Sequence, residues 1–431
     1  MSIRNWNINT WVFDGGYSMG DLSNLYRRIY LSPFCRTLEN SGMIIVGNIL
    51  EDGKWIKIPS EIWKYIKESV GLKKSVFDIL ELCESDSEKR FYDDLLKKLF
   101  MIRVLTFDLN DWRQNVKNLY IDLTSRCNLH CEHCCSSYGD IPAHDLSFEQ
   151  LIQLVKWADT KNIESITLTG GEIYILKDVN EKIKYTRNHF SGKISIITNG
   201  TLITDSDIDI LKECINNVSI SLDGYDLESV ERIRGKHVFE KVMRLIPKLK
   251  EKGIEKISLS MVLVRENKEH REKFLDLCEK LEVKPMLRVL NPAGRARKKY
   301  SEFKVYDTYN QEFEALELEQ IRNNVSMRVL CGAGMTTMSC SANGYIQPCT
   351  VMENKEYCMG TIEDLVNDRL KSLDIICGGV TDKVLECRNC NVRYFCEGTC
   401  RGMNETIYLD EELRSDKCRE NKHKLEKAIW G

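Results

Sequence analysis

Apolar residues recur with two different spacings between residues 118 and 290. Six short apolar runs have the length and composition of strands: 118–123, 163–168, 193–198, 217–222, 256–263 and 284–290. The segments between them have helical periodicity, as in Phe148, Leu151, Ile152, Leu154 and Val155. Alternating strands and helices predict an α/β fold, with a parallel sheet and helices packed outside it.

Each predicted strand ends in a loop with unusual chemistry. The six loops are Cys127–Cys134, Thr169–Glu172, Thr198–Gly200, Asp223–Gly224, Arg265–Asn267 and Asn291–Arg295. In β/α barrels, catalytic groups gather at the carboxyl ends of the strands. We therefore expect an active face at this edge of the sheet.

A smaller unit is predicted before the sheet, at residues 41–107. Two β-like runs, 43–46 and 55–58, flank a good hairpin turn, and three helical patterns and a short run at 102–105 follow. This order is typical of a winged helix. A DNA-binding role is one interpretation, but the third helical pattern, KRFYDDLLKKLF, mixes acids with bases and has no basic stripe. Residues 1–40 are aromatic-rich and are interpreted as a lead-in that packs on a later domain.

Composition narrows the class of protein. The 431 residues are enough for about three domains. The net charge of −3 argues against nucleic acid as the main partner. No run approaches the ~18 apolar residues of a membrane span, and the N-terminus lacks the apolar region of a signal peptide. We therefore expect a cytoplasmic protein, in which 18 cysteines indicate metal binding or catalysis rather than disulfides.

Three of these cysteines share the loop after the first predicted strand. Cys127, Cys131 and Cys134 follow one another at spacings x3 and x2. Three close thiolates can hold three irons of an iron–sulfur cubane and leave the fourth iron open. Zinc is the alternative, although structural zinc prefers a closed set of four ligands. Cys135 adjoins Cys134 but cannot easily turn to the same metal.

A second cysteine-rich region covers the last hundred residues. Cys331 and Cys349 lie on either side of Gly344. A C-x2-C-x5-C-x3-C run follows, formed by Cys387, Cys390, Cys396 and Cys400. Cys418 comes later, by itself. A pair of structural zinc sites is the alternative to iron–sulfur clusters. The remaining cysteines are more typical of small buried hydrophobic residues: Cys35, Cys83, Cys214, Cys278, Cys358 and Cys377.

The first cysteine loop resembles the C-x3-C-x2-C signature of radical S-adenosylmethionine (radical SAM) enzymes. The resemblance implies a partial (β/α)6 barrel at residues 108–295, with a [4Fe-4S] cluster whose open iron binds SAM. By the same resemblance, Gly170, Gly171 and Glu172 match the motif that meets the SAM amino group. The residues expected at the ribose, the methionine part or the carboxylate of SAM are Asn199, Ser221, Asp223 and Arg234. Ordinary turn chemistry or surface charge remains an alternative for these last four.

Residues 331–431 resemble the SPASM extension of radical SAM enzymes, which holds two auxiliary clusters. This resemblance assigns Cys387, Cys390, Cys396 and Cys418 to one [4Fe-4S] cluster. It assigns Cys331, Cys349 and Cys400 to the other, with Cys340 as a fourth ligand or with an iron left open to substrate. Residues 296–330 are charged and helical in pattern, and we expect a bridge there rather than a site.

The N-terminal unit resembles the small peptide-recognition domain of ribosomal-peptide maturases. The combined resemblance implies a maturase that binds the leader of a precursor peptide and receives electrons from a flavodoxin- or ferredoxin-type donor. We expect a cysteine thioether as the product. An epimerase, a carbon–carbon crosslinking enzyme and an anaerobic sulfatase-type maturase are the alternatives among enzymes. A non-catalytic iron–sulfur redox sensor is the alternative from a different class.

Overall fold

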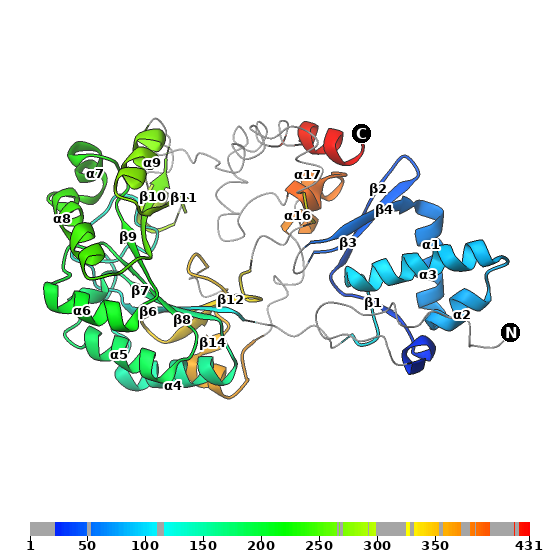
Figure 1. Cartoon of the computed structure of the whole chain (residues 1–431), viewed down its shortest axis with the longest axis horizontal. Coiled ribbons are helices and arrows are strands. Elements are labelled where there is room, and N and C mark those ends of the chain that lie inside the picture. The colour runs from blue at the N-terminus through cyan, green and yellow to red at the C-terminus, as the bar shows by residue number, and fades with distance from the viewer. Residues whose placement is uncertain are drawn as a thin grey trace.

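The computed structural model contains a mainly parallel central sheet and a separate N-terminal antiparallel unit (Figure 1). It describes residues 22–49, 53–109, 116–264, 267, 270–291, 293–298, 325–327, 332–352, 357–371, 380–383, 385–396, 418 and 422–431. Most of the predicted bridge (299–324 and 328–330) and the residues Cys331, Cys377 and Cys400 lie outside these ranges. None of the helices within them combines the length and apolar character that crossing a bilayer needs.

Six parallel strands form most of the central sheet. They are β6 (Asn118–Thr124), β7 (Ser165–Gly170), β8 (Lys193–Thr198), β9 (Asn217–Ser221), β10 (Ile257–Leu263) and β11 (Lys284–Val289). Each pairs in parallel with the next in chain order. These strands agree closely with the six predicted runs, so the expected α/β fold with a parallel sheet is confirmed.

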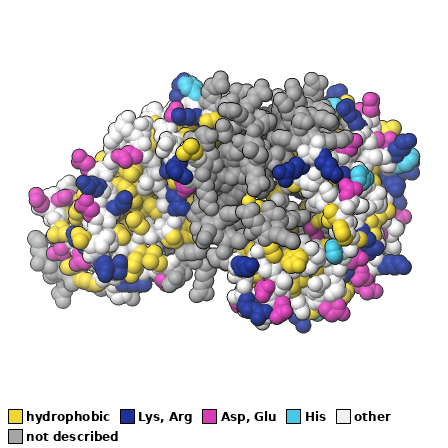
Figure 2. All heavy atoms as spheres, turned by 180° about the vertical axis from the view of Figure 1, so that it is seen from behind, with side chains coloured by type: hydrophobic (Ala, Val, Ile, Leu, Met, Phe, Trp, Pro, Cys, Tyr) yellow, Lys and Arg dark blue, Asp and Glu magenta, His cyan; other side chains and the backbone are white. Residues whose placement is uncertain are grey.

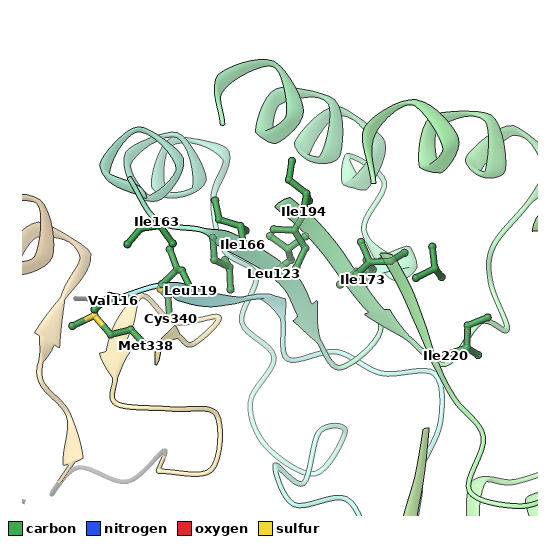
Figure 3. Packing of buried hydrophobic residues seen from close by; sticks show 14 of the residues in the cluster. Val116, Leu119, Leu123, Ile163, Ile166, Ile173, Ile194, Ile220, Met338 and Cys340 are labelled. Atoms are coloured by element: carbon green, nitrogen blue, oxygen red, sulfur yellow. The ribbon is translucent and has the colours of Figure 1, made fainter. Parts of the chain in front are cut away.

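Helices cover one face of this sheet, which we call the outer face (Figure 1). They are α4 (Phe148–Thr160), α5 (Val179–His189), α6 (Asp205–Cys214), α7 (Leu227–Arg234), α8 (Val238–Glu251) and α9 (His270–Lys280). Capping boxes begin α4 at Ser147 and α7 at Asp226. Apolar side chains fill the space between helices and strands, among them Leu119, Leu123, Ile166 and Ile194 (Figure 3).

The opposite face of the sheet, the inner face, is more polar. Side chains alternate between the faces along each strand, and residues in register on neighbouring parallel strands share a face. The register therefore places on the inner face a set of small hydroxyl side chains: Thr167, Thr169, Ser195, Ser219, Ser221, Ser258 and Ser260. Asp122 belongs to the same face, because it is in register with Thr169.

The N-terminal unit has a three-stranded antiparallel sheet and three helices. The strands are β2 (Cys35–Asn40), β3 (Met43–Asn48) and β4 (Trp55–Pro59), and the helices are α1 (Ser60–Gly71), α2 (Val76–Glu81) and α3 (Asp86–Met101). Its core includes Trp63, Ile66 and Leu96. The order of elements follows the prediction, but β2 lies within the segment interpreted as a lead-in. The closing strand, β5 (Leu105–Thr106), pairs with β1 (Tyr30–Leu31) rather than with the hairpin.

The C-terminal region continues the central sheet instead of folding apart from it. Strand β12 (Thr337–Cys340) pairs in parallel with β6, and β13 (Tyr345–Gln347) and β14 (Gly360–Thr361) follow antiparallel. Short helices come next: α14 (Ile362–Val366), α16 (Val380–Lys383), α17 (Leu385–Arg388) and α18 (Arg393–Cys396). The N-terminal unit contacts this region, because Trp55 packs edge-on against Phe395 and Arg36 pairs with Asp382.

Candidate active site

The loop with the three expected cluster cysteines leaves the carboxyl end of β6 and returns antiparallel to it. The Leu146 amide donates to the Leu123 carbonyl at 2.9 Å, and the Arg126 guanidinium pairs with the Asp145 carboxylate. These contacts close the base of the loop, so its cysteines are held at the expected active edge of the sheet.

The three thiols lie within electrostatic range of one another. Burial raises the pKa of Cys127, and the charges of Cys131, Glu172 and Cys134 raise it further. Burial also raises the pKa of Cys131, but the Arg234 guanidinium opposes this by favouring the thiolate. Three thiols on one loop, with an arginine beside one of them, fit the donor set that three irons of a cubane require.

The described residues form no closed site for a single ion. Among the side chains that the structure describes, no three His, Cys, Asp or Glu residues surround a common point closely enough to hold a metal ion. The ligands of a single zinc ion must all lie about 2.0–2.3 Å from one point.

Two glycines of the second loop allow it to pack against the cysteine loop. The Gly171 amide donates to the Thr124 carbonyl, and the Glu172 amide donates to the Arg126 carbonyl, both at 2.8 Å. A Cβ on Gly170 would overlap the Thr124 carbonyl, and a Cβ on Gly171 would overlap that of Arg126. Gly170 also has φ +138°, a conformation that favours glycine. The two glycines therefore allow the loop after β7 to pack directly against the end of β6.

Glu172 is fully buried and links the second loop to the third. Its carboxylate accepts from the Thr198 hydroxyl at 2.8 Å, from the Asn199 amide at 2.7 Å and from the Tyr174 amide at 3.2 Å. Burial raises the pKa of Glu172, although these hydrogen bonds oppose the rise. The structure thus gives the carboxylate three protein donors, whereas the resemblance assigned it to the SAM amino group.

Asn199 connects this loop to the cysteine loop. Its side-chain amide donates to Asn128 Oδ1 at 2.9 Å, and Asn128 in turn donates to the Thr201 hydroxyl at 2.9 Å. Asn199 Oδ1 accepts from the Thr201 amide at 2.9 Å. Asn128, which follows Cys127 in the motif, is therefore held by hydrogen bonds to the loop at the end of β8.

Asp223 and Arg234 form a buried ion pair beside Cys131. Arg234 Nε lies 2.6 Å from Asp223 Oδ2, and Arg234 Nη1 lies 3.9 Å from Cys131 Sγ. His133 Nε2 is 2.9 Å from the same carboxylate oxygen, and the Val262 amide donates to Oδ1 at 2.6 Å. Burial opposes ionisation of Asp223, but the Arg234 and His133 charges outweigh it and lower the pKa of the carboxyl. The pair therefore joins the end of β9 to the cysteine loop.

Sequence reasoning assigned no role to Arg295, which holds the cysteine loop from the far end of the sheet. It lies in the first turn of α10 (Gly294–Lys298), after β11, and is 8% exposed. Its Nε donates to the Cys131 carbonyl at 2.9 Å and its Nη1 to Asp140 at 2.8 Å, while its amide donates to the Cys134 carbonyl. The sequence feature that could have indicated Arg295 was its position in the loop after the sixth predicted strand.

A second overlooked pair lies on the inner face. The Tyr138 hydroxyl of the cysteine loop donates to Asp122 Oδ2 at 2.6 Å. Burial raises the pKa of Asp122 to about 6. On the same face, strands β9 and β10 place Ser221 next to Ser260, with 3.5 Å between their hydroxyls. Ser221 thus lies at the edge where SAM was expected, and it has no charged partner among the described residues.

Six of the expected auxiliary-cluster cysteines, Cys340 among them, lie in the described C-terminal ranges. Cys387 lies on α17 and Cys396 ends α18, with Cys390 between them. The charge of Cys418 contributes to the raised pKa of Cys390, for which burial is the main cause, so these two thiols are near each other. Cys349 follows β13, where the Pro348 carbonyl accepts from the Gly334 amide.

Cys340 lies apart from these loops, in the outer-face core. It is in register with Ile121 of β6, is fully buried, and packs in the apolar cluster that also contains Met338 and Ile163 (Figure 3). Burial, with the nearby Asp122 carboxyl, raises the pKa of its thiol. These surroundings are those of a small core residue.

The site thus consists of a cysteine loop that four strand ends hold at the carboxyl edge of a parallel sheet. Residues 121–278 match the profile described as the Radical SAM superfamily. The chain therefore contains a radical SAM domain, in agreement with the expected enzyme class.

Relatives with this domain differ in their reactions. The chain is 29% identical to the GTP 3′,8-cyclase of Clostridium botulinum (strain Okra / Type B1) over 194 residues, which are 44% of this chain and 61% of the cyclase. It is also 29% identical to the mycofactocin maturase MftC of Mycolicibacterium smegmatis over 175 residues, 40% of this chain and 44% of MftC. The chain therefore spans less than two thirds of either relative.

Two solved structures share the fold over more of the chain. The enzyme anSMEcpe with bound AdoMet has a TM-score of 0.54 at 21% identity, covering 72% of this chain and 97% of its own. Streptococcus suis SuiB bound to its precursor peptide SuiA has a TM-score of 0.52 at 16% identity, covering 90% of this chain and 98% of its own. At these identities the likeness concerns the fold alone.

Proposed function

We propose that this protein is a radical SAM maturase that modifies a ribosomally made peptide. The observation that carries the proposal is the contact network that fixes the cysteine loop. Loops from β7, β8 and β9 and the segment after β11 all bond to it, and they contribute Gly171, Asn199, Arg234 and Arg295. Such a network suits a cluster that must be held rigidly while a second molecule binds its open iron.

The cofactors follow from the same residues. Cys127, Cys131 and Cys134 would hold a [4Fe-4S] cluster, and the C-terminal cysteines would hold two more. With SAM bound, the first cluster supplies a 5′-deoxyadenosyl radical that takes a hydrogen from the substrate, and the auxiliary clusters supply an electron acceptor. Arg234 and Asn199 line the edge where SAM would lie.

The peptide is proposed as substrate because of the N-terminal unit, one fold neighbour and one sequence relative. SuiB is known with a precursor peptide bound, and MftC is a maturase. The N-terminal hairpin has β4 as its outer strand, which an extended leader could join as an additional strand. On the face in Figure 2, acidic and basic side chains intermingle on this unit. Leader binding is therefore expected to depend little on salt. A flavodoxin- or ferredoxin-type protein in the cytoplasm would supply electrons.

The favoured product is a thioether between a peptide cysteine and a carbon of another residue. The carbon would give one hydrogen atom to the 5′-deoxyadenosyl radical, which becomes 5′-deoxyadenosine. The peptide thiol would lose its proton, the sulfur–carbon bond would form, and an auxiliary cluster would accept the remaining electron. Because Cys340 lies in the core, we favour an iron open to the substrate thiolate on the cluster of Cys331, Cys349 and Cys400. Epimerisation or a carbon–carbon link would use the same radical domain with a different second step.

Anaerobic reconstitution followed by a SAM-cleavage assay tests this function. The wild-type protein should release 5′-deoxyadenosine. A variant with Cys127, Cys131 and Cys134 all replaced by Ala should lose one cluster's worth of iron and all cleavage. Cys135→Ala is the matched control and should retain both. Cleavage by the triple variant would refute the assignment, and a wild-type protein with full iron but no cleavage would favour a redox sensor.

A further inference from the structure

The inner face of the sheet carries a cation that has no partner among the described residues. Arg288 lies on β11 in register with Val262, on the face opposite Leu287, which packs against the outer-face core. Its side chain is half-buried, and its Nε is buried without a hydrogen-bond partner. An unsatisfied guanidinium at such a depth is costly unless a ligand completes its hydrogen bonds.

The carboxylates that the structure describes around it already have partners. Asp223 is bonded to Arg234 and His133, and Glu172 accepts from Thr198 and Asn199. Asp122 faces the same side of the sheet, and its carboxylate accepts from the Tyr138 hydroxyl. The described part of this face therefore has positive charge to offer and no matching negative charge.

Arg288 is also at the right level of the sheet to bind a substrate. Val262, its neighbour in register, donates its amide to Asp223 beside the cysteine loop. Two strand spacings separate Arg288 from Asp223, which places their backbones about 10 Å apart.

The surroundings of Arg288 suit a peptide. A small apolar cluster adjoins it on the same face, formed by Val262, Val264, Leu290 and Ala296. Apolar contacts beside unpaired donors are typical of ligand sites.

We propose that Arg288 binds a carboxylate of the peptide substrate, from an Asp or Glu side chain or from the peptide's C-terminus. This inference rests on the proposed function, since it names the chemistry of the substrate of that site. Arg288 acts as a specificity residue, and its fork of donors suits the two oxygens of a carboxylate.

Equilibrium dialysis of the reconstituted full-length protein tests the proposal with three probes. The first is acetyl-Gly-Gly-Asp-Gly-Gly-amide, the second has Asn in place of Asp with the C-terminal amide, and the third has Asn with a free C-terminal carboxylate. At least one carboxylate probe should bind about tenfold more tightly than the neutral probe, and which one identifies the source. Arg288→Gln should remove the preference. Arg288→Lys should keep part of it, because the charge remains. Arg297→Gln, at an exposed position of α10, is the matched control and should keep all of it.

Repeating the dialysis with saturating SAM separates two carboxylate sources. A preference that persists with SAM supports a peptide site. A preference that SAM abolishes would mean that Arg288 holds the SAM carboxylate, and this would overturn the proposal, as would equal binding of all three probes by the wild-type protein. SAM cleavage without peptide is measured on the same preparation, so a failure of the proposed function is seen independently of the probe preference.

Discussion

Removing the charge of Asp223 should destabilise the active edge of the sheet strongly. Asp223→Asn leaves the Arg234 guanidinium, whose side chain is 11% exposed, without its buried carboxylate, which is 1% exposed. Removing one partner from a buried pair costs about 3–5 kcal/mol, chiefly because the other charge remains buried. We therefore expect the free energy of local opening to fall by that amount.

Hydrogen exchange at the Val262 amide measures this effect, because that amide donates to Asp223. Asp226→Asn is the matched control, since Asp226 caps α7 and Asn caps a helix almost equally well. The double variant Asp223→Asn/Arg234→Met should lose less than the sum of the two single changes, because it leaves no unpaired arginine. A cost below about 1 kcal/mol, or strict additivity, would refute the buried-pair reasoning.

The pH dependence gives a second check on the same pair. The pKa of Asp223 is lower in the folded protein than in the unfolded chain. Its contribution to stability is therefore present above the unfolded pKa of about 4 and is lost as the pH falls through the folded pKa. The difference between the wild-type protein and Asp223→Asn should shrink as the pH falls below about 4.

Three further predictions concern neighbouring residues. Gly171→Ala should lower iron retention after reconstitution, because its Cβ would overlap the Arg126 carbonyl, whereas Gly71→Ala at the open end of α1 should not. Asp122→Asn should raise the free energy of unfolding at pH 8 by up to about 3 kcal/mol and have little effect near pH 4. The reason is that the folded pKa of Asp122 is about 6, so the stability that this group contributes is lost as the pH rises through 6. Equal effects at the two pH values in denaturant titrations would contradict this. Arg295→Gln should increase proteolytic cleavage of the cysteine loop, because its three bonds to that loop are lost; unchanged cleavage would show that the other loop contacts suffice.

The sequence allowed the central sheet to be predicted because its strands are short apolar runs between helices. β10, for example, has Ile257, Leu259 and Met261 on the helix-covered face, and such alternation is visible in any sequence. The gathering of the strand-end loops was also predictable, because the carboxyl ends of parallel strands meet at one edge of the sheet.

The contacts that organise the site could not be predicted in the same way. Arg295 lies more than 150 residues from Cys131, to whose carbonyl it donates, and no local pattern reports such a pair. The donors that surround the Glu172 carboxylate likewise come from another strand end, which no local pattern reports. Strand β12 joins β6 across more than 200 residues, so the placement of Cys340 in the core became visible only with the sheet order.

The transfer of deuterium from peptide to 5′-deoxyadenosine tests the central claim most directly. The precursor is sought as a small cysteine-rich peptide encoded beside this chain, and it is prepared with deuterium on carbon and incubated with the reconstituted enzyme, SAM and a reductant. We expect 5′-deoxyadenosine one mass unit heavier than the unlabelled product, and a peptide that has lost two hydrogens and hides one cysteine from alkylation for each crosslink. Unlabelled 5′-deoxyadenosine together with an unchanged peptide would contradict the proposal that this protein modifies that peptide by hydrogen abstraction.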